Sequence, residues 1–303
     1  MATSVSQPGC GMEATPVLGT WHAATPGLVA QLQCDGFTPQ LDEALQALVI
    51  FDQSCVLFYP SGGSPLLLHD NLQGISEPGA MHNYLNGTYL LDPVYTACAH
   101  GQATGLYRMS ELAPDAFFEG DYFNSPDVHP CISMQSGTLS EEIVFICALP
   151  GIGHLAYSLM RLNASAKFSP VQIEALQNCQ AMVAVLLQRH YQGVGAQVDD
   201  SALALREHLN SAFSRFAADQ LTPREQLIVS MILRGHSSLS ISLHLGIAEG
   251  TVKNHRKHLY CKLGISSQSE LFHLFVNFVL SHTASMPLAI AGSAIQFQEA
   301  FAS

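Results

Sequence analysis

The stretch that decides the fold is residues 221–265, which read LTPREQLIVSMILRGHSSLSISLHLGIAEGTVKNHRKHLYCKLGI. It begins with Thr222 as an N-cap, Pro223 at the first helical position, and Glu225 placed to complete a capping box. Apolar residues then recur at helical spacing as far as Gly235, a residue type that commonly ends helices. These signals together predict a helix that runs from Pro223 to just before Gly235.

Two further helices are predicted in the same stretch. The second covers about 238–245 and the third about 249–263, with a tight turn at 246–248 between them. The apolar positions of all three helices fall at spacings that can share one core. A short helix, a tight turn and a longer helix in this order predict a helix-turn-helix, whose last helix enters the major groove of DNA.

The third helix carries polar and basic side chains on the face opposite its apolar residues. The residues expected to contact DNA are Thr251, Lys253, Asn254, Arg256, Lys257, His258 and Lys262. Lys253 and Lys257 can donate to guanine or to phosphate, and Asn254 has the donor and acceptor pair that fits adenine. The other four are placed to contact phosphates. A basic helix face can also be a solvated surface, but the caps and the turn favour DNA binding.

The charge distribution sets this region apart from the rest of the chain. Of 303 residues, 12 are basic and 24 are acidic, which gives a net charge of −12. Residues 1–220 hold six basic residues against twenty acidic ones, a net charge of −14. Residues 221–280 hold six against three, a net charge of +3, so the last fifth of the chain is expected to form a separate domain that meets phosphates.

The motifs in this region resemble the DNA-binding domain of LuxR-type transcriptional regulators. The matching motifs are Leu221-Thr222-Pro223-Arg224-Glu225, Leu245-Gly246-Ile247, Glu249-Gly250-Thr251-Val252-Lys253-Asn254-His255 and Lys262-Leu263-Gly264-Ile265. The resemblance implies a four-helix domain that binds a two-fold, double-stranded DNA operator as a homodimer, with RNA polymerase as a further candidate partner. The chain departs from the family pattern at Ser238-Leu239-Ser240, at Ala248 and at Gln268.

The resemblance also implies that the fourth helix, about 267–279, supplies dimer contacts. An apolar stripe on this helix is formed by Leu271, Leu274, Phe275 and Phe278. A stripe of this kind is equally typical of ordinary core packing. The dimer role and the core role are therefore both open for these four residues.

The residues before 193 predict an α+β domain with an antiparallel sheet. Strands are expected at 54–59, 65–70, 105–109, 142–149 and 154–162, and helices at about 41–49, 77–85, 93–100, 111–119 and 169–192. We expect a poorly ordered segment at 1–38, an α+β sensor domain at 39–192 that is GAF/PAS-like by the resemblance described next, a linker and connecting helix at 193–220, the helix-turn-helix domain at 221–280 and a tail at 281–303.

One segment of this domain resembles the autoinducer-binding domains of quorum-sensing regulators. It is Tyr84-Leu85-Asn86-Gly87-Thr88-Tyr89-Leu90-Leu91-Asp92-Pro93-Val94, and in that family the aromatic residues and the Asp hold an acyl-homoserine lactone. The only Trp is Trp21, far upstream of the family's pocket positions, so an effector of another kind is expected. The candidate ligand-binding residues are Tyr84, Tyr89, Asp92, Tyr95 and Arg108.

Each of these candidates also has a structural interpretation. Asp92 before Pro93 is a typical N-cap, aromatic residues beside a sheet are typical core, and Arg108 can pair with Glu111 instead of a ligand carboxylate. The domain can also bind a protein partner or only dimerise. No catalytic motif, metal-ligand spacing or cofactor motif is present, so we expect no enzyme activity, metal or cofactor. Scattered cysteines and the lack of basic residues before Arg108 favour a cytoplasmic protein without a membrane partner.

Overall fold

The computed structural model describes residues 14–61, 64–72, 80–124, 139–162, 165–194 and 212–283. Five strands form one antiparallel sheet in the order β2-β1-β5-β4-β3. Their bounds are Gln53–Pro60 (β1), Leu66–Asp70 (β2), Gly105–Arg108 (β3), Leu139–Leu149 (β4) and Gly153–Leu162 (β5). The expected α+β class is therefore confirmed, and the strands lie where the sequence predicts them to within a few residues.

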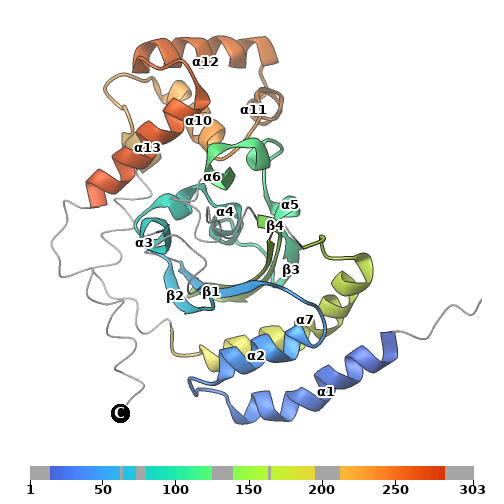
Figure 1. Cartoon of the computed structure of the whole chain (residues 1–303). Coiled ribbons are helices and arrows are strands. Elements are labelled where there is room, and N and C mark those ends of the chain that lie inside the picture. The colour runs from blue at the N-terminus through green and yellow to red at the C-terminus, as the bar shows by residue number, and fades with distance from the viewer. Residues whose placement is uncertain are drawn as a thin grey trace, which may run out of the picture.

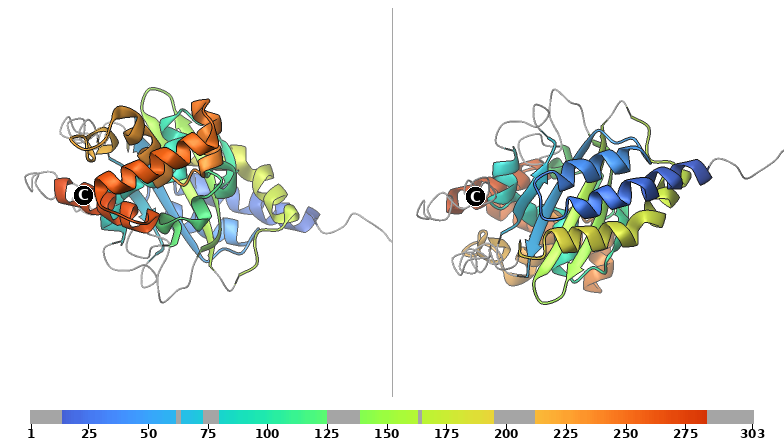
Figure 2. Two further views of the ribbon diagram at one scale, coloured as in Figure 1. Left: turned by 90° about the horizontal axis from the view of Figure 1, so that it is seen from above. Right: turned by 90° about the horizontal axis from the view of Figure 1, so that it is seen from below.

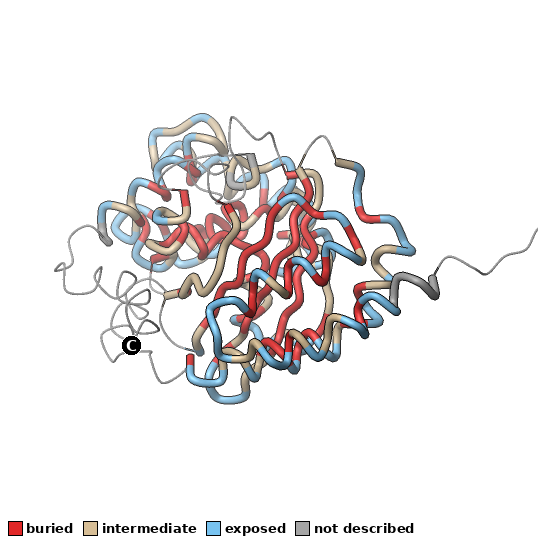
Figure 3. The backbone as a smooth tube through the Cα atoms, turned by 60° about the horizontal axis from the view of Figure 1, so that its bottom comes forward, coloured by how far each residue is buried: buried red, intermediate tan, exposed pale blue. Residues whose placement is uncertain are grey.

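Helices cover both faces of the sheet. One face packs against α1 (Ala14–Ala30), α2 (Phe37–Gln46) and α7 (Pro170–His190), which lie side by side in the right panel of Figure 2, seen from below. The other face packs against α3 (Ala80–Leu85), the 3-10 helix η1 (Thr88–Leu91), α4 (Pro93–Ala99) and α5 (Met109–Leu112). The sheet between these layers is buried along most of its length, as Figure 3 shows.

The described part of the N-terminal segment, residues 14–38, differs from the prediction of poor order. The chain is helical from Ala14 to Ala30, and Trp21 and Leu28 are 3% and 0% exposed. Both side chains pack with α2 and α7 in the core under the sheet. The sequence pattern misses this helix because its apolar residues are mixed with Gly, Thr and Pro26 and show little periodicity.

The C-terminal domain consists of four helices. They are α10 (Pro223–Leu233), α11 (Ser238–Leu245), α12 (Glu249–Leu263) and α13 (Gln268–Thr283), preceded by the short α9 (Ala212–Arg215). The predicted capping box at Thr222 and Glu225 is present, and Gly246 and Gly264 end α11 and α12 in the left-handed conformation. The expected linker falls largely outside the described residues, as does the tail beyond residue 283.

The helix-turn-helix domain lies on the α4 side of the sheet, on the opposite side of the sheet from α1 and α7 (Figure 1). The hydrophobic core on that side is continuous through both domains, because it includes Tyr84 and Val94 of the first domain as well as Ile228 and Phe275 of the second. A change in the packing of the α4 layer can therefore reach the DNA-binding helices through direct contacts.

Candidate nucleic-acid interface and ligand site

The outer face of α12 is open to solvent. Lys253, Asn254 and Lys257 are all exposed, as are Thr251 and His258. Lys253 forms an i,i+4 ion pair with Glu249, with 2.7 Å between Nζ and Oε1 and with both side chains largely solvated. Such a surface pair contributes only about 0.3–0.5 kcal/mol, so it leaves the ammonium group available to DNA.

Two of the residues expected to contact phosphates, Arg256 and Lys262, form hydrogen bonds within the domain. The Arg256 guanidinium donates to Ser238 Oγ at 3.1 Å and to Gln268 Oε1 at 3.1 Å, and so joins α12 to the first turns of α11 and α13. Lys262 Nζ lies 2.7 Å from Oε2 of Glu225, which also accepts from Thr222 in the capping box. The Lys262 contact lowers the pKa of Glu225 to about 2. Arg256 and Lys262 are thus held by contacts within the domain, and their expected phosphate contacts stay predictions.

The departures from the family pattern have local effects that the structure makes visible. Ala248 occupies the N-cap of α12 and has no side-chain oxygen to accept a hydrogen bond from the first turn. Gln268 at the start of α13 accepts from Arg256. At the start of α11, Ser237 caps the helix through its hydroxyl, and Leu239 beyond it is 55% exposed.

The stripe on α13 is mostly core. Leu271 and Phe275 are 0% and 1% exposed, and the ring of Phe275 stacks on Phe213 with 4.7 Å between ring centroids. Phe278 packs edge-on against Phe216, whereas Leu274 is 40% exposed. Leu271 and Phe275 therefore have the core role in this domain, and the dimer role of the stripe stays a prediction.

The two domains meet where the segment between α5 and α6 (Asp121–Asn124) approaches α10 and α11. The Asp115 carboxylate accepts from the backbone N–H of Ser237 at 2.9 Å and from its hydroxyl at 2.5 Å. Hydrogen bonds from Ser237 lower the pKa of Asp115 in spite of its partial desolvation. The amide of Ala116 donates to the carbonyl of Gly235 at 2.9 Å.

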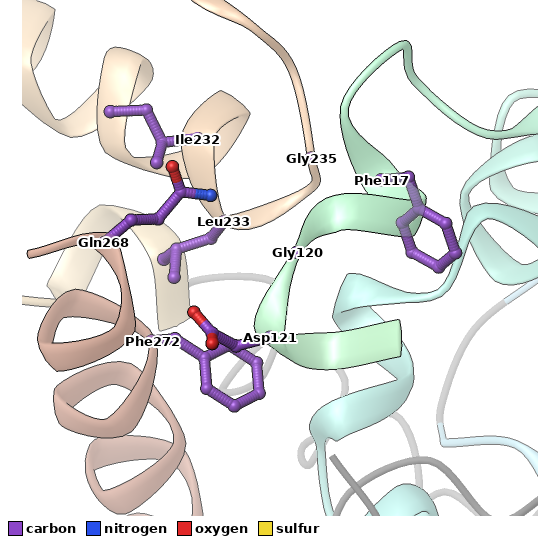
Figure 4. Close-up of a pocket in the computed structure, with 8 residues that line it drawn as sticks. All are labelled: Phe117, Gly120, Asp121, Ile232, Leu233, Gly235, Gln268 and Phe272. Atoms are coloured by element: carbon purple, nitrogen blue, oxygen red, sulfur yellow. The ribbon is translucent and has the colours of Figure 1, made fainter. Parts of the chain in front are cut away.

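Close packing accompanies these hydrogen bonds. A Cβ atom on Gly235 would lie 2.6 Å from the Cα of Phe117, so only glycine fits at this approach. In Figure 4, Gly120 and Asp121 face Leu233 and Phe272 across the boundary. The cavity left between them measures about 10 Å³, room for a single water molecule and not for a metabolite. The boundary is thus a fitted contact between the domains.

Tyr84 and Asp92 come together on the α4 side of the sheet, joined by Tyr59 of β1. Tyr84 Oη donates to Asp92 Oδ2 at 2.6 Å and lies 2.6 Å from Tyr59 Oη. Asp92 is also the N-cap of α4, because its Oδ1 accepts from the amide of Val94 at 2.7 Å. Burial raises the pKa of Asp92 to about 6 and that of Tyr59 well above its ordinary value. Asp92 therefore has the structural role of a cap and a buried polar contact at once.

The remaining candidate ligand-binding residues, Tyr89, Tyr95 and Arg108, lie on different faces of the sheet. Tyr89 and Tyr95 lie near Tyr84, with ring centroids 6.3 Å apart for Tyr84 and Tyr89 and 4.7 Å apart for Tyr89 and Tyr95. Arg108 is aligned with Ile143, whose side chain belongs to the α7 side of the sheet. Its guanidinium pairs there with Glu141 at 2.6 Å. The expectation that Arg108 lines the same site is therefore corrected, as is its expected side-chain pairing with Glu111, which instead accepts from the Arg108 backbone.

Sequence reasoning missed two buried polar residues on the α4 side, Glu142 and Gln53. Glu142 is 6% exposed, and burial together with the nearby Asp92 raises its pKa to about 8. Gln53 is 0% exposed, and neither atom of its amide group has a hydrogen-bond partner in the described part of the chain. For Glu142 the available signal was the Glu141-Glu142 pair in a strand, since adjacent strand residues point to opposite faces and both faces of a sheet covered by helices are buried; Gln53 had no such signal.

Metal-ligand clusters and membrane-spanning helices were sought in the described residues. No group of three or more His, Cys, Asp or Glu side chains there is arranged to hold a metal ion. None of the helices in that part is long and apolar enough to cross a bilayer. Cys55, Cys98, Cys147 and Cys179 are buried free thiols, as expected of small apolar residues.

Comparisons with known proteins agree with the geometry of the C-terminal domain. Residues 219–275 match the family described as bacterial regulatory proteins, luxR family. A protein of Aeromonas salmonicida named as an HTH-type transcriptional regulator in the exeN 3′ region is 26% identical over 195 residues, 63% of this chain and 95% of the relative. The nitrate/nitrite response regulator protein NarL of Escherichia coli K12 is 25% identical over 190 residues, 55% and 86% of the two chains.

Among solved structures, the VqsR LBD domain from Pseudomonas aeruginosa is 22% identical with a TM-score of 0.48, and the match covers 57% of this chain and 98% of that one. The family assignment comes from the helix-turn-helix residues. Residues 219–275 of this chain are a helix-turn-helix DNA-binding domain of the LuxR family of bacterial transcriptional regulators.

Proposed function

We propose that this protein regulates transcription by binding a two-fold DNA operator as a homodimer, under the control of a small molecule bound by its N-terminal domain. The observation that carries the DNA-binding part is the exposed face of α12, where Lys253, Asn254 and Lys257 are free of the sensor domain. A recognition helix with these side chains exposed can enter the major groove and contact base edges. Two such helices in a dimer would read half-sites about 10 base pairs apart.

The sensor part of the proposal rests on the buried polar cluster beside α4. Asp92 and Glu142 are buried carboxylates on the side of the sheet that also contacts the helix-turn-helix domain. A ligand that prefers one packing of this layer would shift the population of one domain arrangement over another. The contact between Asp115 and Ser237 is the element through which that shift would reach α11.

The experiment is a binding titration with the operator selected from a random DNA pool. We expect Lys253→Ala to weaken binding by about 1–3 kcal/mol and to reduce the dependence of affinity on salt. Lys167→Ala, which removes the same charge from an exposed position in the sensor domain, is the matched control and should bind like the wild type. Equal affinity of Lys253→Ala and wild type across salt concentrations would contradict the proposed DNA-binding face.

A second candidate function for the N-terminal domain is to bind a protein partner or only to dimerise. It is favoured by the hydrogen bonds from Tyr59 through Tyr84 to Asp92, which satisfy these groups without a ligand. A ligand bound only by the folded state raises the melting temperature. Thermal-shift screening of the full chain against metabolite pools therefore separates the two candidates.

A further inference from the structure

Two carboxylates are buried on the α4 side of the sheet. Asp92 is 7% exposed and Glu142 is 6% exposed. Burial and the charge of Asp92 raise the pKa of Glu142, whereas the hydrogen bond with the Ser158 hydroxyl lowers it. Asp92 accepts hydrogen bonds from Tyr84 Oη and from the amide of Val94, whereas Glu142, with fewer donors, is costly to ionise unless a positive charge accompanies it.

No basic side chain in the described part of the chain forms an ion pair with either carboxylate. The neighbouring Glu141, in contrast, has both a counter-charge and a hydrogen-bond donor. It lies on the opposite face of the sheet, where Arg108 pairs with it at 2.6 Å and the amide of Phe168 donates to it at 2.6 Å. Strand alternation thus gives Glu141 a cation and leaves Glu142 without one.

An independent observation on the same face points to a missing binding partner. Gln53 of β1 is aligned with Met160 of β5, and Met160 is aligned with Glu142 of β4. Residues aligned across a sheet share a face, so Gln53 and Glu142 flank Met160 in one row. Gln53 is fully buried, yet both atoms of its amide group are without a hydrogen-bond partner among the described residues. Each buried donor or acceptor without a hydrogen-bond partner lowers the stability of the folded protein by about 1–3 kcal/mol.

We propose that this row is a binding site for a small aliphatic amine that carries a second polar group. The ammonium would lie between the carboxylates of Asp92 and Glu142, which supply oxygen acceptors and the missing counter-charge, and the second polar group would pair with the Gln53 amide. Met160 is unbranched and can repack around the ligand. This inference rests on the proposed role of the domain as a small-molecule sensor, and it names the chemical class of the effector.

The test is thermal unfolding of the full-length protein with 1,4-diaminobutane, with 1-aminobutane and with the uncharged 1,4-butanediol. The diamine should raise the melting temperature in a concentration-dependent way, 1-aminobutane should do so less, and the diol should have no effect. Glu142→Gln and Asp92→Asn should each weaken the apparent affinity for the diamine at least about tenfold, the loss expected of one charge-assisted contact. Asn is also a good N-cap, so the start of α4 is retained.

Glu43→Gln is the matched control, because Glu43 is an exposed acid on α2, across the sheet. It should leave the response to the diamine unchanged. An equal response to the diol, or an undiminished response in Glu142→Gln, would overturn the inference. A shift caused by anionic or neutral metabolites with none caused by amines would also overturn it, while operator binding, measured separately, would leave the proposed regulatory function standing.

Discussion

Replacing Glu142 with Gln is expected to change how the stability of the sensor domain depends on pH. Burial and Asp92 raise the pKa of Glu142 from 4.5 to about 8 in the folded chain, whereas the unfolded chain has the ordinary value. The folded state therefore holds the proton of Glu142 more tightly than the unfolded state does. The stability that depends on this proton is fully present below pH 4.5 and is lost as the pH rises toward 8. The loss amounts to about 3 kcal/mol at pH 7.

The assay is urea unfolding of wild type and Glu142→Gln at a series of pH values between 4.5 and 8, without ligand. Trp21 is the only Trp and is 3% exposed in the core of the sensor domain, so its fluorescence reports the unfolding of that domain. All other groups titrate in both proteins. The stability of the Gln variant relative to wild type should therefore rise by about 3 kcal/mol between pH 4.5 and pH 7.

The control is again Glu43→Gln, which removes an acid from an exposed position and should follow the wild-type pH profile. Parallel profiles for wild type and Glu142→Gln would refute the reasoning, because they would mean that Glu142 titrates alike in the folded and unfolded chains. A diamine bound between Asp92 and Glu142 would reduce the difference, since it would stabilise the ionised carboxylate of Glu142, which only the wild type has.

Further predictions concern the helix-turn-helix domain. Asp115→Ala removes a carboxylate that occupies the N-terminus of α11, an end of the helix that favours anions such as DNA phosphates. We therefore expect the affinity for the operator, measured by fluorescence anisotropy, to rise about two- to fivefold, and to rise more at low salt. An unchanged affinity would contradict this. Ala248→Ser supplies the missing N-cap of α12 and should stabilise the domain by about 1 kcal/mol in urea unfolding, whereas Ala248→Val should give no gain.

The elements that the sequence predicts well are those with strong local signals. The bounds of α11 and α12 agree with the prediction, because Gly246 and Gly264 end these helices in a conformation that other residues adopt only at a cost. The start of α7 is equally clear from Ser169, which accepts from the amide of Gln172, followed by a Pro. In contrast, the predicted helix at 111–119 is divided into α5 and the 3-10 helix η2 (Phe117–Glu119), since Pro114 interrupts it.

The candidate site was predictable only in part. Tyr84 and Asp92 were found because they share a short segment, and the hydrogen bond between them is local in sequence. Gln53 and Glu142 are 89 positions apart, and only the alignment of β1, β5 and β4 places them in one row. The partner of Arg108 is Glu141 of β4, which a local pattern cannot indicate because only the pairing of β3 with β4 brings the two side chains together.

The sequence by itself determined the helix-turn-helix domain, its recognition helix and the step in charge at residue 220, because capping, turn and periodicity signals act over a few residues. Only the tertiary structure decided which cations of α12 are held by contacts within the domain and which acid of the Glu141-Glu142 pair meets Arg108. Those outcomes depend on contacts between distant strands and helices, whose geometry no local pattern encodes.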